Sequence, residues 1–368
     1  MSEMAVIDNA WDTICSFEWL LKAEKNARRR KATRCEVMNF NARLEDNLLD
    51  IQELLQKGEY RLGPYHKKWV YVPKKRLVMA LDYPDRVVQW SIYQLLMPFY
   101  DRLFIEDSYA CRIGKGSHKA VDRLQYWIRQ DSRKPKPYYY LKLDISKYFY
   151  RVDHGKLIEI LSKRIKDKKL MEFLETVIDD PEEKFGLPLG MKAEDVPFED
   201  WLQDVGMPIG NLTSQLFANI YLNELDQFCK HTLKIHQYIR YMDDVVILAD
   251  SKEKLHEYRR QIEKYLNEEL FLNFNDKTAI RPITVPVEFV GHKITPTKKT
   301  LRKSSVKRIK KEIKIFSYSY ASGRMSKEQF IRRIAAVNGI MVHADTGNLK
   351  GKLQKIFKEQ SIKARSVA

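Results

Sequence analysis

The sequence predicts an α+β protein, and three observations support that fold class. Helical and strand-like patterns are mixed along the chain with few regular β-α-β units. An apolar stripe with helical spacing runs through residues 44–55, whereas residues 138–145 and 238–249 have the pattern of short strands. The chain of 368 residues is 44% hydrophobic and 11% aromatic, so it is long and apolar enough to build two or three lobes.

The predicted elements begin with a helical segment, residues 9–57, in which Lys57-Gly58 ends the pattern. Residues 60–81 are strand-like on both sides of Pro73. The later elements follow in this order: a helix from Asp85 to Leu103, a linker at 131–137, a strand from Tyr138 to Ile145, a loop at 180–208, a helix at 211–230, a strand pair from Tyr238 to Ala249 around a tight turn, a helix from Lys252 to Leu270, a strand from Pro286 to Ile294 and a basic helical tail at 303–368.

The charge balance is strongly basic. Lys and Arg number 66 against 49 Asp and Glu, a net charge of +17. Such an excess indicates either nucleic acid or an anionic membrane surface as a partner. The positive charge gathers at residues 22–34 and 302–314, and neither cluster is backed by the wide apolar face of a membrane-surface helix. Nucleic acid is therefore the favoured partner, and a solvated helix face is the alternative for each cluster.

The termini and the cysteines indicate a cytoplasmic protein. The first residues lack the basic and apolar regions of a signal peptide, and no apolar run approaches the roughly 18 residues that span a bilayer. Four cysteines lie far apart without a Cys-x-x-Cys pair, which favours a reducing compartment. Four histidines lack paired ligand spacing and are expected to be structural: His118, His154, His292 and His343.

Aspartates interrupt two of the predicted strands. Asp144 follows the apolar residues 141–143, and Asp243 with Asp244 separates two β-forming runs at a hairpin tip. Each site alone is explained by a strand cap or a turn. Together they suggest a metal site, because partly buried carboxylates need a cation and Mg²⁺ prefers carboxylate oxygens. Three such aspartates suit two Mg²⁺ ions that promote phosphoryl displacement.

These aspartates stand in segments that resemble the motifs of reverse transcriptases. Their Tyr-x-Asp-Asp motif is matched by residues 241–244, and their first carboxylate motif by Asp144 with Ser146-Lys147-Tyr148-Phe149. Other segments match in the family's order: Lys74-Lys75-Arg76-Leu77-Val78 and Asp85-Arg86-Val87-Val88-Gln89 resemble the fingers motifs, residues 206–215 the segment that joins the carboxylate motifs, and residues 287–292 the primer-grip hairpin. The match spans roughly residues 60–315, which is most of the chain.

A narrower resemblance concerns Ile209-Gly210-Asn211-Leu212-Thr213-Ser214-Gln215, which is similar to the form found in reverse transcriptases of diversity-generating retroelements. Retroviral and group II intron enzymes usually have Gln and Pro at the positions of Ile209 and Gln215. Residues 301–308 also resemble the thumb of that retroelement group. Residues 180–205 depart from the pattern as an insertion, and antiviral-defence reverse transcriptases share the same core.

The resemblance implies a right-hand polymerase that copies RNA into DNA with Mg²⁺. It implies a metal site at Asp144, Ile145, Asp243 and Asp244, and a nucleotide site at Lys74, Arg76, Phe149, Ile209, Gly210, Gln215 and Lys277. Phe149 would exclude a ribose 2′-hydroxyl by bulk, and an aliphatic Ile209 beside the nascent base pair would lower fidelity at template adenine. The alternatives are a core aromatic for Phe149, plain packing for Ile209 and surface roles for the cations.

The implied nucleic-acid contacts lie at Arg28, Arg29, Arg30, Tyr241, Met242, Gly291, Arg302, Lys303, Lys307 and Arg308. The implied lobes are an N-terminal helical basic arm at 1–58, fingers with part of the palm at 59–137, a palm at 138–300 and a helical basic thumb at 301–368. The 68 residues after 300 are too few for a thumb and an RNase H domain together. The implied partners are template RNA, a primer or cDNA, dNTPs and a small basic accessory protein, without a membrane.

Three other functions remain open from the sequence: an antiviral-defence reverse transcriptase, a template-independent DNA polymerase on the same palm, and a non-catalytic RNA-binding scaffold. The retained aspartates argue against the scaffold, because such proteins usually lose them.

Overall fold

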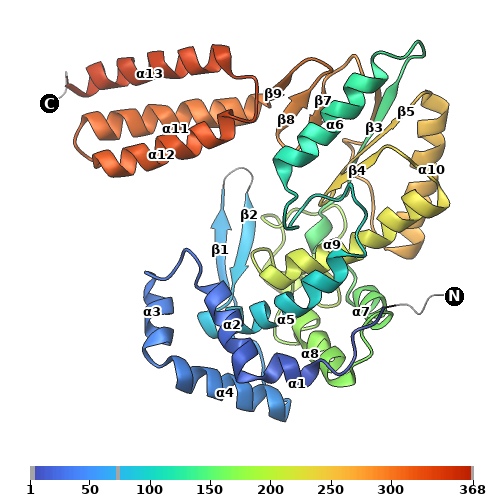
Figure 1. Ribbon diagram of the computed structural model, residues 1–368, viewed down its shortest axis with the longest axis vertical. Coiled ribbons are helices and arrows are strands. Elements are labelled where there is room, and N and C mark those ends of the chain that lie inside the picture. Colours follow the sequence, from blue (N-terminus) through green and yellow to red (C-terminus); the bar gives the residue numbers. More distant parts are fainter. Residues whose placement is uncertain (1–4, 72–74, 366–368) are drawn as a thin grey trace. The chain divides into compact units, whose positions relative to one another are not determined.

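The computed structural model describes residues 5–71 and 75–365, and it confirms the predicted α+β class (Figure 1). The chain divides into two compact units. Unit 1 comprises Met1–Arg112, Asp144–His236 and Tyr258–Asp276, and unit 2 comprises Ile113–Leu143, Gln237–Glu257 and Lys277–Ala368. Both units are therefore assembled from segments that are distant in the sequence.

Unit 1 is mainly helical. Its helices are α1 (Trp11–Cys15), α2 (Phe17–Ala27), α3 (Cys35–Ala42), α4 (Leu44–Lys57), α5 (Tyr83–Asp101), α7 (His154–Ser162), α8 (Lys168–Ile178) and α9 (Leu212–Gln227). The predicted helical segment 9–57 is thus four helices separated by short turns. Gly58 ends α4 in the left-handed conformation, with φ of 72°, which agrees with the predicted helix end.

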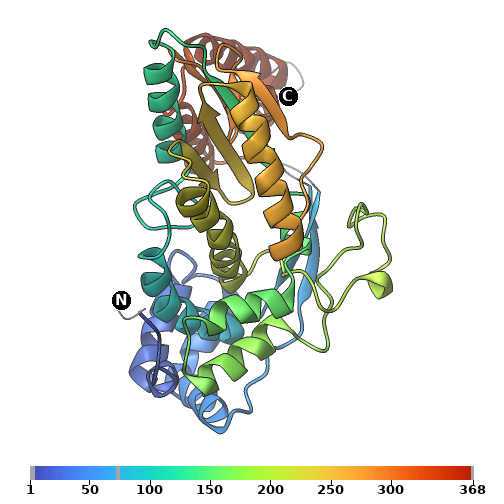
Figure 2. The ribbon, with the colours of Figure 1, turned by 90° about the vertical axis from the view of Figure 1, so that its right-hand side faces the viewer.

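A two-stranded hairpin also belongs to unit 1. It pairs β1 (His66–Val70) with β2 (Arg76–Ala80) in antiparallel register, so that Val70 lies opposite Arg76. The loop at 180–208 contains the short 3₁₀ helix η2 (Phe198–Asp200) and projects away from the helices of unit 1 in Figure 2. Phe185, Leu187 and Trp201 from this loop form one buried cluster with Leu77 and Met79 of β2. The insertion that the sequence left unplaced therefore packs on the β1–β2 hairpin.

Unit 2 contains a four-stranded sheet in the order β4-β5-β3-β6. Its strands are β3 (Tyr139–Asp144), β4 (Tyr238–Tyr241), β5 (Asp244–Ala249) and β6 (Ala279–Pro282). A second sheet has the order β7-β8-β9, with β7 (Val287–Phe289), β8 (His292–Ile294) and β9 (Lys299–Leu301). The strand predicted from the pattern at 286–294 is thus a hairpin, as the resemblance of residues 287–292 to the primer-grip hairpin implied, because Val290-Gly291 turns the chain.

The remaining helices of unit 2 are α6 (Ser117–Asp131), α11 (Lys303–Ala321), α12 (Lys327–Met341) and α13 (Gly347–Arg365), while α10 (Lys252–Glu269) crosses the boundary between the units. Helices α11, α12 and α13 lie side by side as a bundle in Figure 1. Their shared core contains Ile309, Ile313, Val337, Met341, Leu349 and Leu353. The predicted basic helical tail is therefore a packed three-helix bundle.

No helix within the described part of the chain is long and apolar enough to cross a membrane.

Candidate active site

The aspartate pair lies at the tip of the β4–β5 hairpin. Tyr241 pairs with Asp244, which leaves Met242 and Asp243 as a two-residue turn. Met242 has φ of 53°, a positive value of the kind that hairpin turns of the primed types require at the first turn position, where glycine is common. A methionine there is strained by about 1–3 kcal/mol, and such strain persists where the surrounding structure enforces it.

Arg240 supplies part of that enforcement. Its side chain is fully buried in β4, and its guanidinium donates a hydrogen bond of 3.3 Å to the Met242 carbonyl. Ile239, which precedes Arg240 in β4, and Val245, which lies opposite Arg240 in β5, are also fully buried. A buried guanidinium aimed at the turn fixes the backbone that presents Asp243.

A second cation meets the hairpin from the neighbouring strand. The Lys142 ammonium in β3 forms an ion pair with the Asp244 carboxylate in β5, and the two strands are adjacent in the sheet. Their side chains are 19% and 25% exposed, respectively. Lys142 precedes Asp144, the last residue of β3, by two positions, and alternate residues of a strand share one face.

The chemistry of this turn fits a hard divalent cation. Asp243 and Asp244 are both half-buried, and the Asp244 carboxylate already accepts one cation, the Lys142 ammonium. Among residues 5–71 and 75–365, no three His, Cys, Asp or Glu side chains are grouped as a ready cation cage. Mg²⁺ commonly uses one or two carboxylates and completes its shell with water and substrate phosphates. The carboxylates therefore fit as part of a metal shell.

Asp144 and Ile145 are anchored by another segment of unit 1. The Asp144 carbonyl accepts a hydrogen bond of 2.8 Å from the Asn275 amide, and Ile145 forms an antiparallel bridge with Phe274. Ile145 is buried, whereas Asp144 is half-buried. These contacts fix the backbone at Asp144 from a second direction, beyond its place at the end of β3.

Phe149 lies in the short 3₁₀ helix η1 (Tyr148–Tyr150), which follows Lys147 in a left-handed conformation with φ of 47°. The Tyr148 hydroxyl donates to the Ala218 carbonyl at 2.6 Å, and the Phe149 carbonyl accepts from the Met207 amide at 2.7 Å. Phe149 itself is half-buried. Phe149 is thus held through its own carbonyl and through the anchored side chain of the preceding residue, while its ring stays partly exposed.

Residues 209 and 210 lie against β2. The Ile209 carbonyl accepts a hydrogen bond of 2.9 Å from the Met79 amide. Gly210 has φ of 125°, and a Cβ there would lie 2.9 Å from Val78 Cγ1 and 3.3 Å from the Met79 carbonyl oxygen. Glycine is therefore required by both conformation and space. Unit 1 consequently brings the predicted residues Ile209 and Gly210 beside the hairpin that carries Arg76.

The 180–208 loop also reaches the Phe149 turn. Trp201 packs edge-on against Tyr150, with ring centroids 5.8 Å apart, and the Leu187 carbonyl accepts a hydrogen bond from Arg151. Across β1, Lys67 forms an ion pair of 2.7 Å with Glu183 and lies 3.5 Å from the centre of the Phe198 ring. This loop therefore contacts both the β1–β2 hairpin and the Phe149 turn, which sequence reasoning missed.

The remaining predicted nucleotide-site residues lie in other elements. Gln215 lies in α9, where its side-chain oxygen accepts from the Cys111 thiol at 3.3 Å, whereas Lys277 is exposed beyond α10. Lys74 lies outside the described residues, and Arg76 is exposed at the start of β2.

The predicted basic contacts form two separate groups. Arg29 and Arg30 are exposed in the turn after α2, while Arg28 pairs with Glu24 and hydrogen-bonds to Asn41. Burial, followed by the charges of Arg86 and Arg34, lowers the pKa of the neighbouring Lys31. The second group begins at the start of α11 and contains Arg302, Lys303, Lys307 and Arg308. Each group is therefore a local concentration of positive charge.

Three of the histidines expected to be structural lie together in unit 2. The rings of His118 and His343 stack with centroids 3.5 Å apart, and His292 meets His118 edge-on at 6.4 Å. His118 Nδ1 and His292 Nε2 are buried and lack a hydrogen-bond partner within the described structure. Burial lowers the pKa of both residues, and the nearby His343 adds to this effect. Their sequence spacing carried no signal, because α6, β8 and the turn after α12 contribute one ring each.

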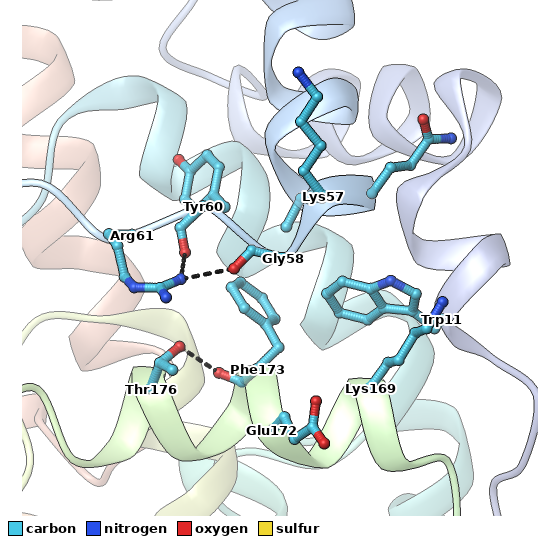
Figure 3. Close-up of a pocket in the computed structure, with 11 residues that line it drawn as sticks. Trp11, Lys57, Gly58, Tyr60, Arg61, Lys169, Glu172, Phe173 and Thr176 are labelled. Carbon is cyan, nitrogen blue, oxygen red and sulfur yellow. Dashed lines mark hydrogen bonds between the residues drawn. The ribbon is translucent and has the colours of Figure 1, made fainter.

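A cavity of about 330 Å³ lies elsewhere in unit 1, at the end of α4 (Figure 3). Trp11, Tyr60 and Phe173 form its aromatic wall, and Lys57, Arg61 and Lys169 line it with positive charge. The Arg61 guanidinium donates to the carbonyls of Gly58 and Tyr60, at 3.0 and 2.9 Å. These lining residues lie outside the carboxylate motifs.

Comparison with known proteins identifies the family of this chain. The family model described as reverse transcriptase (RNA-dependent DNA polymerase) matches residues 65–294, which is more than half of the chain. The chain therefore belongs to the reverse transcriptase family, whose members synthesise DNA on RNA templates from nucleotides and generally use a divalent metal. The predicted enzyme class is thereby confirmed.

Individual relatives are distant. Protein YkfC of Escherichia coli K12 is 25% identical over 292 residues, covering 69% of this chain and 73% of that protein. The group II intron-encoded protein LtrA of Lactococcus lactis is 21% identical, covering 68% of this chain and 50% of LtrA, so the chain spans about half of that relative. The retron Ec73 reverse transcriptase of E. coli is 24% identical over 56% of this chain and 61% of its own length.

A solved structure confirms the fold alone. Telomerase from Candida tropicalis, in complex with a telomeric RNA fragment, aligns with a TM-score of 0.50 and 14% identity, covering 82% of this chain and 55% of the telomerase.

Proposed function

We propose that Asp144, Asp243 and Asp244 are the catalytic carboxylates of an RNA-directed DNA polymerase that works with two Mg²⁺ ions. The observation that carries the proposal is the Met242-Asp243 turn, which presents an aspartate pair beside the strand that ends in Asp144. A phosphoryl-transfer centre built on carboxylates requires cations, and carboxylate oxygens suit Mg²⁺. The backbone of Ile145 completes the proposed metal site.

The chain's own residues would act by positioning. Arg240 holds the Met242 carbonyl, and the hydrogen bond from Asn275 holds Asp144, so the carboxylates stay fixed as substrates change. When bound, the metal ions supply activation of the primer hydroxyl and neutralisation of the triphosphate. Tyr241 and Met242 would contact the primer end. In such reactions positioning and electrostatics provide most of the rate enhancement.

The proposed nucleotide site rests on Arg76, Ile209 and Gly210, which lie in or beside β2, and on the motif resemblance for Lys74, Phe149, Gln215 and Lys277. Arg76 and Lys74 would bind the triphosphate, since guanidinium groups match phosphate oxygens. Gly210 lets the backbone lie close to β2, and Phe149 would exclude a ribose 2′-hydroxyl. Gln215 would face the template, and Lys277 would protonate the leaving pyrophosphate.

Selectivity tests the role of Phe149 directly. Replacing Phe149→Ala is expected to raise rNTP use relative to dNTP by about 10–100-fold, the range that one small steric contact provides. The measurement compares kcat/KM for dNTP and rNTP on one primed template. An unchanged ratio in a folded variant would assign Phe149 to the core.

Nucleic acid would bind two basic surfaces. The arm at residues 1–58 contributes Arg28, Arg29 and Arg30, and α11 contributes Arg302, Lys303, Lys307 and Arg308. Gly291, in the turn before β8, would lie at the primer. These assignments accompany the proposed lobes: fingers at 59–137, palm at 138–300 and thumb at 301–368. Phosphate contacts of this kind weaken as salt rises, so binding to a primer–template should be strongly salt-dependent.

The primary test is DNA synthesis by the purified chain on a primed RNA template with Mg²⁺. The proposal predicts incorporation of dNTPs that depends on both the template and the metal. Synthesis that persists after RNA is omitted would instead identify a template-independent polymerase. Synthesis that appears after the RNA and accessory protein encoded nearby are added would show that the chain needs these partners. Absence of synthesis under all these conditions would reject the proposal.

The proposed biological role is diversification of a target gene by error-prone copying. Ile209 places an aliphatic side chain at the position where retroviral and group II intron enzymes usually have glutamine. The Ile209 carbonyl accepts a hydrogen bond from the Met79 amide in β2. Loss of a hydrogen-bonding amide beside the nascent pair removes a polar check on base geometry. Sequenced cDNA should carry errors concentrated at template adenines, and Ile209→Gln should reduce them. An error rate that is low and equal at all four template bases would favour an antiviral-defence enzyme.

A further inference from the structure

Lys142 occupies the middle of β3, in the strand next to the candidate catalytic hairpin. Its ammonium meets the Asp244 carboxylate across the β3–β5 boundary of the sheet. With 19% of its side chain exposed, Lys142 is largely withdrawn from water. A lysine in this setting costs desolvation energy unless a negative partner compensates for it. Asp244 is that partner.

Lys142 also touches the second hairpin of unit 2. Its ammonium lies 5.2 Å from the centre of the Phe289 ring in β7, and Phe289 is 1% exposed. A cation at this distance from a ring face is attracted by the aromatic electrons. Lys142 therefore contacts the β4–β5 hairpin through a carboxylate and the β7–β8 hairpin through an aromatic ring.

The charge of Lys142 bears on metal binding because its partner Asp244 is one of two adjacent carboxylates in the β4–β5 hairpin. Two adjacent carboxylates, Asp243 and Asp244, repel one another and attract any available cation. A resident ammonium neutralises one of the two charges before a metal arrives. The compact ammonium of lysine concentrates that charge at a point, while its stem follows the sheet surface. The amount of negative charge left for divalent ions then depends on Lys142.

We propose that Lys142 is a positioning residue that serves as the resident counter-ion of Asp244 and limits how strongly the Asp243–Asp244 turn binds divalent cations. This inference rests on the proposed polymerase function. In this arrangement Lys142 holds the Asp244 carboxylate, so Asp244 contributes less to metal binding than Asp144 and Asp243 do. Lys142 thereby keeps the metal site weak enough to be completed by substrate phosphates.

The test compares metal binding with catalysis in four proteins: wild type, Lys142→Gln, Asp244→Asn and the double variant. Mn²⁺ binding is measured by electron paramagnetic resonance without nucleic acid, and the half-saturating Mg²⁺ concentration is measured during primed RNA copying. Removing the ammonium should tighten Mn²⁺ binding about fivefold, which corresponds to roughly 1 kcal/mol. The half-saturating Mg²⁺ concentration should fall similarly, while the maximal rate declines because Asp244 loses its anchor.

The double variant separates a specific pair from a general charge effect. If Lys142 acts through Asp244, adding Lys142→Gln to Asp244→Asn should leave Mn²⁺ affinity unchanged. Equal tightening in both backgrounds would show a diffuse charge effect and overturn the proposal. Unchanged Mn²⁺ affinity in the single Lys142→Gln variant would also overturn it, whatever happens to the rate.

Controls address folding and charge. Lys142→Arg should retain wild-type metal affinity, and Lys142→Met keeps the apolar stem if the Gln variant is unstable. Lys163→Gln serves as the matched control, because Lys163 forms an ion pair of 3.2 Å with Glu159 on α7, outside the candidate site. The Mn²⁺ measurement needs no nucleic acid. It therefore decides the counter-ion role even if the chain fails to copy RNA, which would reject the proposed function separately.

Discussion

Two hairpins of unit 2 share a design and differ in what their turns carry. The β4–β5 and β7–β8 hairpins each have a two-residue turn, and each turn begins with a bulky residue in the left-handed region. Met242 has φ of 53° and Val290 has φ of 45°. For a β-branched residue such as Val290 this conformation is particularly unfavourable.

The difference lies in the residues that follow the strained position. In β4–β5 the turn continues into two aspartates, with Arg240 and Lys142 as supporting cations. In β7–β8 it continues into Gly291 and the buried His292, whose Nδ1 donates to the Val290 carbonyl at 3.0 Å. The comparison teaches that similar positive-φ turns are stabilised by different groups: by a hydrogen bond from the charged Arg240 in β4–β5, and by a hydrogen bond from the His292 ring in β7–β8. We therefore expect the two turns to respond differently to the same changes.

The largest effect on stability is expected from removing Arg240, the buried cation of the β4–β5 hairpin. Arg240→Met would delete the hydrogen bond to the Met242 carbonyl and leave polar groups unpaired in the sheet. Hydrogen bonds from charged groups contribute roughly 1.5–3 kcal/mol, so the free energy of unfolding should fall by about that amount. Denaturant unfolding measures it. A loss below about 0.5 kcal/mol, the usual limit for surface changes, would contradict the supporting role of Arg240.

The same substitution in both turns sharpens the comparison. Met242→Gly and Val290→Gly should each relieve strain, offset in part by the entropy of glycine, for a net stabilisation of about 1 kcal/mol. Met242→Gly should also slow RNA-templated incorporation by about 10–100-fold, because the aspartate pair loses its fixed geometry. Val290→Gly should cost less activity than Met242→Gly. Equal losses in rate would remove the functional distinction between the turns.

The smallest effect concerns pH and the histidine cluster beside the second hairpin. The folded pKa values of His118 and His292 lie below the ordinary value of about 6.5, so the unfolded chain binds more protons in that range. Stability should be complete above about pH 6.5 and decline as pH falls further. The facing charges are the Asp122–Lys299 ion pair and the ring of His343. Thermal unfolding between pH 8 and 5 measures the slope, and His292→Gln should flatten it.

Local sequence patterns predicted the parts of this molecule whose causes are local. The aspartate pair between two β-forming runs located a tight hairpin turn, and Lys57-Gly58 located the end of α4. Interrupted apolar patterns also indicated the carboxylate strand β3. Turn and cap chemistry depends on neighbouring residues, so a single sequence contains the information.

Contacts between segments that are distant in sequence could not be predicted from local sequence patterns. Trp201 packs on Tyr150 and joins the buried cluster with β2, although the two residues are 51 positions apart in sequence. The histidine cluster combines three elements, and the Lys142–Asp244 pair joins two strands that meet only in the folded sheet. The helical prediction for residues 9–57 is confirmed, but the turns that divide this segment into four helices gave no signal, because they keep polar, helix-compatible residues.

The most direct measurement of the central claim is the single-turnover rate of RNA-templated dNTP addition in Asp243→Asn and Asp244→Asn. Asparagine preserves size and removes the charge, and Glu159→Gln on α7 is the matched control for loss of one carboxylate. We predict a rate loss above the roughly 100-fold that follows loss of an outer metal-site partner. The unfolding midpoint should be unchanged in Asp243→Asn and lower in Asp244→Asn, which removes the carboxylate that pairs with Lys142. Asp243 should show the larger loss, because Asp244 is held by Lys142. Near wild-type rates in both folded variants would contradict the assignment of this turn as the polymerase centre.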